Sequence, residues 1–289
     1  MLFLVGAIPI RDLPLSVGRI TLAEEGFTVD GHVLNVDRGT AAMITVVCTV
    51  CKEFGLESPM ALVAGDIGTR DGSMKIYQYL VENLSRMDVS VLTSHYIMPD
   101  IKKNQKVVEK IRSLKKKPIL VADAGSMYVA KAGGDASYYD VFTPDLGETA
   151  FLADEKAVHP MYTRGFIFHL EEDVPQLIKR AYRSGNAART MFVKGEVDYI
   201  CQDGEIIEEI SEPNVEALEP VGGTGDTITG MISALIYAGK SPLEACRIAG
   251  RVNRRAGELS HPTPATQVRD IIKCIPAALK EVLSKEKFE

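Results

Sequence analysis

A glycine-rich stretch that carries one carboxylate lies late in the chain, where residues 222–230 read GGTGDTITG. It leads into the apolar segment 231–238, whose hydrophobic residues recur at three- and four-residue intervals and predict a helix. Glycines at a helix start let backbone N–H groups approach an anion closely, and the helix dipole favours negative charge there. The stretch therefore predicts an anion-binding site at the mouth of a helix.

Asp226 is the acid within this stretch. A carboxylate beside an anion site repels the anion that the site binds, so we expect this carboxylate to have a chemical role. The role we expect is to take a proton from a hydroxyl that faces a bound phosphate. The stretch is neither a Walker loop, because no Lys-Ser/Thr pair follows its glycines, nor a GxGxxG motif. A glycine turn before a helix is also common without any catalytic role.

Two further segments place polar residues directly after predicted strands. Lys194 and Gly195 follow the apolar run 190–193, a position that suits phosphate contact, although a lysine there can simply cap a sheet edge. Asp145 and Glu148 stand in TPDLGE at 143–148, where each is either a helix cap or a ligand.

Two more polar residues end predicted strands. For His95 a substrate contact is one interpretation, and a surface or internally satisfied histidine is the more expected one. For Asp123 the structural interpretation is that its carboxylate ties down the following loop by Asx-type hydrogen bonds.

The elements that must position these residues alternate along the chain. Residues 1–36 predict short strands with an edge hairpin, and a further hairpin is expected over 195–207 with its turn at Asp203-Gly204. The other predicted strands are 59–64, 89–93, 118–123, 141–143 and 190–193, and the predicted helices are 41–54, 73–84, 102–114, 148–154, 174–184, 231–238, one starting at 241 and 268–283. This alternation predicts one doubly wound α/β domain over 1–289, with a mostly parallel sheet and ligands at the carboxyl ends of its strands.

Composition narrows the class of protein. A formal net charge of −6 argues against nucleic-acid binding, and no apolar run reaches the roughly 20 residues of a membrane span. The N-terminus has no basic segment ahead of its apolar residues, and the five cysteines are spread through apolar surroundings, so we expect a cytoplasmic protein. Cys48 and Cys51 form a CxxC pair without further metal ligands and are expected in the core.

The stretch Gly222–Gly230 resembles the Gly-x-Gly-Asp signature of the ribokinase-like superfamily, and within it the branch of ATP- or ADP-dependent NAD(P)H-hydrate dehydratases. Three further stretches are similar to that branch in order and spacing: Val193–Gly195 followed by Asp203-Gly204, Thr143–Glu148, and the C-terminal segments that begin at Ser241 and Val268. The resemblance covers mainly the C-terminal half.

The resemblance implies a ribokinase-like α/β fold and a set of roles. Asp226 is the implied catalytic base, and the amides of Gly223, Thr224 and Gly225 form the implied anion hole. Lys194, Gly195 and Gly225 are implied to bind ATP or ADP with Mg²⁺, and Ala41, Asp145 and Asp226 to contact a small hydroxylated substrate, with no metal ligand assigned. A homo-oligomer is also implied.

The chain departs from the branch at two places. Asp145 stands where the family has a histidine, and Ser94–Pro99 stands where the family has a Gly-Pro-Gly-Leu-Gly loop. The loop Gly65–Gly72 resembles a sugar-kinase loop without its paired aspartate. The implied activity is dehydration of NAD(P)H hydrate. The alternatives are a kinase for a sugar or vitamin alcohol that uses Asp226 in the same way, and, more remotely, a nucleotide-binding protein without turnover.

Overall fold

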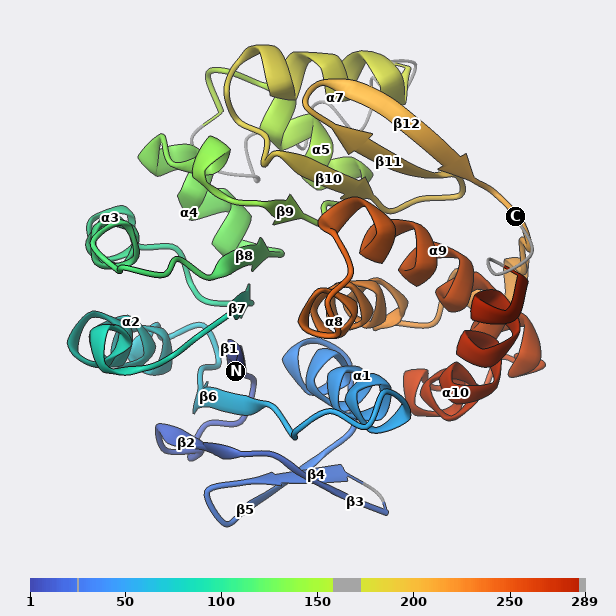
Figure 1. The fold of residues 1–289 in the computed structure, drawn as a ribbon, viewed down its shortest axis with the longest axis horizontal. Helices are drawn as coiled ribbons and strands as arrows, with labels where there is room; N and C mark the ends of the chain where they lie inside the picture. The colour runs from blue at the N-terminus through green and yellow to red at the C-terminus, as the bar shows by residue number, and fades with distance from the viewer. Residues whose placement is uncertain (25, 158–172, 286–289) are drawn as a thin grey trace.

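The computed structural model describes residues 1–24, 26–157 and 173–285, and within these it contains a nine-stranded sheet of order β12-β11-β10-β9-β8-β7-β1-β6-β2 (Figure 1). The inner strands run parallel: β1 (Leu2–Ile8), β6 (Met60–Gly65), β7 (Val91–His95), β8 (Ile119–Ala122), β9 (Val141–Phe142) and β10 (Thr190–Val193). The antiparallel strands lie at the two edges: β2 (Ser16–Arg19), β11 (Asp198–Gln202) and β12 (Glu205–Ile210).

Helices cover both faces of this sheet, and each face has its own apolar core (Figure 1). One face carries α2 (Asp71–Asn83), α3 (Ile101–Arg112), α4 (Gly125–Gly133), α5 (Leu146–Ala153) and α7 (Val174–Arg183). The other carries α1 (Thr40–Glu53), α8 (Thr224–Tyr237), α9 (Pro242–Leu259) and α10 (Val268–Lys285). The doubly wound, mostly parallel α/β class predicted from the sequence is confirmed.

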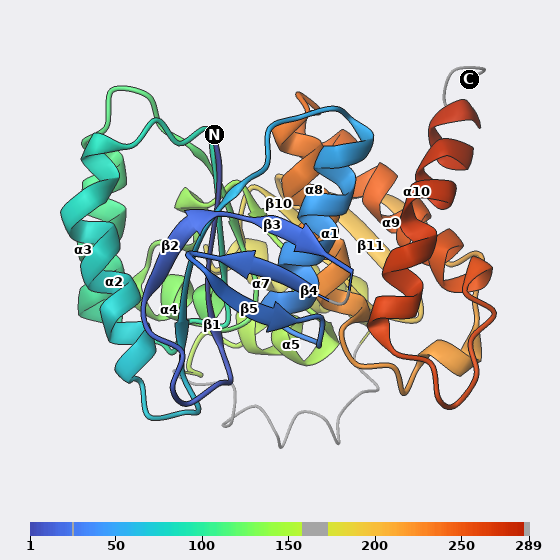
Figure 2. The same ribbon diagram turned by 90° about the horizontal axis from the view of Figure 1, so that it is seen from below.

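A small three-stranded antiparallel sheet lies beside α1 and the end of the large sheet (Figure 2). Its strands are β3 (Thr21–Ala23), β4 (Gly26–Val29) and β5 (His32–Asn35), and it buries Phe27 and Leu34 in the core on the α1 side. Short strands over residues 1–36 were expected. The exception is β1, which is not part of an edge hairpin: all seven of its residues are buried and it pairs with β6 and β7 at the centre, as a continuous apolar run allows in a parallel sheet.

Local signals explain most helix boundaries. Ser241 and Glu244 form a capping box ahead of Pro242 at the start of α9. Asp145 and Glu148 form another, so α5 begins at Leu146, two residues before the predicted start. Helix α4 was not predicted, because its sequence is short and carries glycine at both ends. Cys48 and Cys51 are buried thiols in α1, as expected. Among the described residues, no helix has the length and apolar character that crossing a bilayer requires.

Candidate active site

A cavity of about 830 Å³ opens at the carboxyl ends of the parallel strands, beside the start of α8. Among the residues that line it are seven of the predicted site residues, namely Asp145, Lys194, Gly195, Gly223, Thr224, Gly225 and Asp226. Residues from the ends of β8, β9 and β10 and from two segments of the C-terminal half therefore share one space, as the rule for doubly wound sheets predicts.

The start of α8 has the geometry of an anion site. Gly223 is the N-cap residue with φ 106°, a conformation that a residue with a Cβ adopts only with strain. Thr224, Gly225 and Asp226 then form the first turn, whose amides have no carbonyl one turn earlier to bond. Asp226 is 8% exposed, and its Oδ2 accepts a hydrogen bond of 2.6 Å from the amide of Gly39. An acid and free amides therefore face the same cavity.

Lys194 lies directly against this turn. Its Nζ atom is 3.1 Å from both Oδ1 and Oδ2 of Asp123, and a Cβ atom on Gly225 would come within 3.2 Å of its Cδ atom. Glycine at 225 thus leaves room for the lysine side chain. Burial alone would raise the pKa of Asp123, but the Lys194 ammonium and the His95 ring outweigh it and hold that pKa well below its usual range.

His95 corrects part of the sequence interpretation, because it is completely buried rather than on the surface. Its Nε2 atom lies 3.2 Å from Oδ1 of Asp226 and 3.5 Å from Oδ2 of Asp123, and its Nδ1 atom lies 3.1 Å from the hydroxyl of Thr40. Burial alone would lower the pKa of His95, but the two carboxylates raise it to about 9. In the sequence, the one signal that placed His95 in the site was its position at the end of a predicted strand.

Tyr96, the next residue, adopts a left-handed conformation with φ 51°, which is unusual for a bulky residue. Its half-exposed ring lines the cavity and meets the His95 ring edge-on, with ring centroids 4.6 Å apart. The turn at Tyr96 thus directs His95 inward and Tyr96 toward the cavity. This is the segment that replaces the Gly-Pro-Gly-Leu-Gly loop.

The start of α5 supplies two more carboxylates. Asp145 and Glu148 accept hydrogen bonds from each other's amides, so the capping interpretation is confirmed for both, and both also line the cavity. The hydroxyl of Tyr128 donates a 2.5 Å hydrogen bond to Oε1 of Glu148. Burial, together with the nearby charges of Asp123 and Asp145, raises the pKa of Glu148 to about 7 although Lys194 opposes it.

Buried hydroxyl groups support the site from the sheet side. Thr229 donates a 2.6 Å hydrogen bond to Oδ2 of Asp123, and its hydroxyl also lies 2.8 Å from that of Thr143. Asp123 further accepts a hydrogen bond from the amide of Ala124, which is the local loop contact expected from the sequence. The carboxylate is thus fixed by its own loop, by α8 and by the lysine that follows β10, while Thr143 supports Thr229.

Helix α9 supports the site from the other side through two consecutive residues. Asn253 bonds the carbonyl of Thr224 and the hydroxyl of Thr227 in the first turn of α8. Arg254 bonds the carboxylate of Asp198 and the carbonyls of Gly195 and Glu196, and so fixes the loop that follows Lys194. Neither residue was singled out in the sequence, because each contact joins distant segments.

Two other sequence expectations concern the substrate side. Ala41 lies in α1 and is buried within the apolar core, while its neighbours Gly39 and Thr40 contact Asp226 and His95. A substrate contact by Ala41 stays a prediction.

Asp66, in the loop similar to that of sugar kinases, is buried and accepts hydrogen bonds from Gly68, Arg70 and Ser73 at the start of α2. Its carboxylate therefore organises its own loop.

Two sets of side chains are relevant to a metal ion. His95, Asp123 and Asp226 place ligand atoms within 4.8 Å of one another, but Lys194 already compensates Asp123, and Mg²⁺ prefers oxygen ligands and retains waters. This buried cluster therefore suits Mg²⁺ poorly. Asp145 and Glu148 offer carboxylate oxygens at the cavity wall, where nucleotide phosphates would supply the remaining oxygens, and this pair fits Mg²⁺ better.

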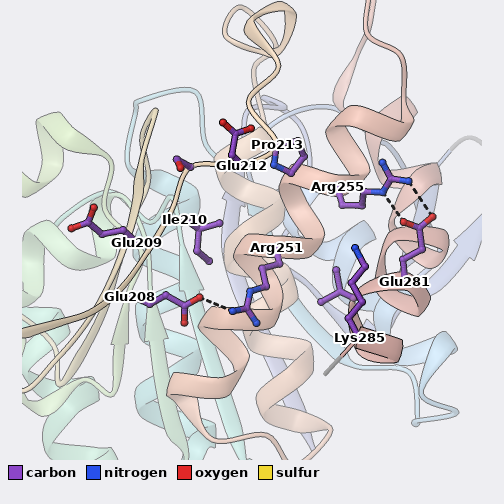
Figure 3. Close-up of a pocket in the computed structure, with 11 residues that line it drawn as sticks. Glu208, Glu209, Ile210, Glu212, Pro213, Arg251, Arg255, Glu281 and Lys285 are labelled. Carbon is purple, nitrogen blue, oxygen red and sulfur yellow. Dashed lines mark hydrogen bonds and ion pairs between the residues drawn. The ribbon is translucent and has the colours of Figure 1, made fainter. Parts of the chain in front are cut away.

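A second hollow, of about 460 Å³, lies between β12, α9 and α10 (Figure 3). Four of its charged side chains form two ion pairs: Arg251 bonds Glu208 at 2.8 Å and Arg255 bonds Glu281 at 2.6 Å. Its lining therefore resembles a network of surface ion pairs more than a site for a charged ligand.

The chain matches the protein family described as NAD(P)H-hydrate dehydratase over residues 35–277. An uncharacterized protein of Methanocaldococcus jannaschii is 42% identical over 242 residues, which are 83% of this chain and all of that protein. An ADP-dependent (S)-NAD(P)H-hydrate dehydratase of Haloterrigena turkmenica is 33% identical over 88 residues, and a bifunctional NAD(P)H-hydrate repair enzyme of Hyperthermus butylicus is 29% identical over 174 residues. The matched segments span 33% and 30% of these two enzymes.

Solved structures share the fold at low sequence identity. The ADP complex of Bacillus subtilis pyridoxal kinase aligns with a TM-score of 0.51 and 16% identity, covering 86% of this chain and 88% of the kinase. Escherichia coli phosphofructokinase-2 in complex with fructose-6-phosphate aligns with a TM-score of 0.52 and 13% identity, covering 96% and 99%. These matches confirm the ribokinase-like fold predicted from the sequence.

Proposed function

The chain belongs to the NAD(P)H-hydrate dehydratase family of enzymes, and from this membership and the geometry of the cavity we propose that it dehydrates NAD(P)H hydrate at the expense of ATP or ADP. The observation that carries the proposal is that Asp226, the first turn of α8 and Lys194 face one cavity. This combination suits transfer of a phosphoryl group to a hydroxyl.

Asp226 is the proposed base. The hydroxyl of the hydrate gives its proton to the Asp226 carboxylate as its oxygen attacks the terminal phosphorus of the nucleotide, and the bond from that phosphorus to the leaving nucleotide oxygen breaks. The phosphorylated carbon–oxygen bond then breaks with inorganic phosphate as leaving group. Loss of a proton from the neighbouring carbon restores the ring double bond. The net change is loss of water from the hydrate and hydrolysis of one phosphoanhydride bond.

The other residues of the cavity bind and orient. The amides of Gly223, Thr224 and Gly225 would neutralise the terminal phosphate, and Lys194 with Gly195 would position the nucleotide. Mg²⁺, which reduces the negative charge of nucleotide phosphates when bound, would be held by Asp145 and Glu148. Glu148 would bind it in the ionised form, which its raised pKa leaves partly populated near neutral pH. We propose a small-molecule substrate contact for Asp145 as well.

The test is incubation of purified protein with Mg²⁺, hydrated NADH and either ADP or ATP. We expect recovery of the reduced nicotinamide absorbance with one inorganic phosphate released per molecule recovered. ADP is the first nucleotide to use, because relatives named as dehydratases are ADP-dependent. Asp226→Asn is the matched control. Failure to recover NADH with either nucleotide, together with phosphate transfer to an added sugar or vitamin alcohol, would falsify the proposal in favour of a kinase.

A further inference from the structure

The side chains of Lys194, Asp123, His95 and Asp226 form a row of alternating charge across the floor of the cavity. The Lys194 ammonium is 3.1 Å from Asp123, whose Oδ2 is 3.5 Å from Nε2 of His95, which in turn is 3.2 Å from Oδ1 of Asp226. The His95 side chain is fully buried, and the other three side chains are 3–14% exposed. The row therefore has little access to water.

We infer that His95 is a positioning residue that carries a proton on both ring nitrogens and, as an imidazolium, holds the carboxylate of Asp226 in place. The charge balance of the row supports this. With a neutral His95 the row contains two carboxylates and one ammonium, which leaves one uncompensated negative charge in a buried position. With an imidazolium the row is neutral, and burial strongly favours that arrangement over an unpaired charge.

Both ring nitrogens have suitable partners for this state. The Nε2 atom lies 3.2 Å from Asp226 and 3.5 Å from Asp123, in ion-pair contacts rather than aligned hydrogen bonds, and the Nδ1 proton can be donated to the Thr40 hydroxyl oxygen 3.1 Å away. The titratable groups that face the row from the packed elements are Asp123 after β8, Lys194 after β10, Asp226 in α8, Tyr96 after β7, and Asp145 and Glu148 at the start of α5. The two acidic side chains of α5 add negative potential, which also favours the imidazolium.

The consequence for Asp226 is that both of its oxygens are fixed, Oδ1 by His95 and Oδ2 by the amide of Gly39. Lys194 on the proposed nucleotide side and Asp226 on the proposed acceptor side are thus connected by a continuous series of contacts between opposite charges through Asp123 and His95. The role of Asp226 as a base rests on the proposed function, whereas the inferred protonation state of His95 does not.

The first test needs no turnover. The ring nitrogens of the five histidines are labelled with ¹⁵N, and the His95 signal is assigned by its loss in His95→Gln or, if that variant does not fold, by through-bond correlation to the assigned backbone. We expect a doubly protonated His95 at pH 7.5. Asp123→Asn and Asp226→Asn should each lower the pH at which His95 loses its proton. A singly protonated His95 at pH 7.5 in the folded wild type overturns the inference, whether or not the protein is a dehydratase.

The second test separates positioning from general damage. His95→Gln keeps an N–H donor without the charge, and it should lower kcat by at least about tenfold while the KM for the nucleotide changes little. His32→Gln is the matched control and should leave both constants unchanged. An unchanged kcat in a folded His95→Gln protein contradicts the inference. If His95→Gln does not fold, the ¹⁵N measurement on the wild type and on Asp226→Asn decides alone, with the same outcome overturning it.

Discussion

Lys194 places its ammonium 3.1 Å from each carboxylate oxygen of Asp123, so a residue that follows β10 is paired symmetrically with one that follows β8. The two strands are not neighbours, because β9 lies between them in the sheet. The Lys194 side chain therefore crosses over the carboxyl end of β9, where Thr143 begins the next loop. The pair fixes the position of the Lys194 ammonium at the wall of the cavity.

Replacement of Lys194 by methionine should weaken nucleotide binding by about 10- to 100-fold, since a charge-assisted contact to phosphate is lost. It should also destabilise the protein, because the buried row of charges is left with one uncompensated negative charge. The double change Lys194→Met with Asp123→Asn should recover stability but not nucleotide affinity. Calorimetric titration with ADP and urea unfolding measure the two effects. Recovery of affinity in the double variant would show that Lys194 does not contact the nucleotide.

Asp226→Asn should reduce turnover by at least about 100-fold and leave nucleotide affinity nearly intact, because the amide cannot accept the proton of the attacking hydroxyl. Its Oδ1 atom can still occupy the position that accepts the hydrogen bond from Gly39. Steady-state kinetics and nucleotide titration on the same preparation check both halves. A variant that retains the wild-type rate rules out Asp226 as the base.

Folding stability should depend on pH through His95. Its pKa in the folded protein, about 9, is above the ordinary value of 6.5, so its contribution is complete below about pH 6.5 and is lost as the pH rises toward 9. Urea unfolding should therefore show a larger loss of stability between these pH values for wild type than for His95→Gln, on the order of 1–3 kcal/mol. Glu148, with a pKa of about 7, titrates within the same range, but it does so in both proteins and therefore cancels in the comparison. Parallel curves would mean that His95 carries no buried charge.

Lys131 is predicted to be important for the stability of α5. Its buried ammonium donates hydrogen bonds to the carbonyls of Phe151, Asp154 and Ala157 at the end of that helix, at 2.5, 2.5 and 2.9 Å. Lys131→Met should lower the free energy of unfolding by about 2–4 kcal/mol, because buried carbonyls lose their donor. Lys156→Met, at an exposed lysine, is the control and should change it by less than about 0.5 kcal/mol. Equal effects of the two changes would contradict the assignment.

The sequence was sufficient for the order of the elements and for most of the cavity. Continuous apolar runs located the central strands, because a parallel sheet buries both faces of its strands, and the glycines at 223 and 225 marked the start of α8. It was insufficient where a role depends on distant partners. His95 contacts Asp226, and Arg254 contacts the loop after Lys194, only in the folded chain. Neither contact can be predicted from the residue type alone. Helix α4 lacked a periodic signal of its own.

Helix α9 bonds the first turn of α8 through Asn253 and the loop after Lys194 through Arg254. Consecutive residues of a helix are separated by a fixed rise and rotation. Helix α9 therefore sets the distance between the amides of the first turn of α8 and the side chain of Lys194. A one-residue insertion earlier in α9 would rotate both side chains by about 100° and release both segments together. The precision of the cavity therefore depends on the register of a helix that contributes no proposed chemical group.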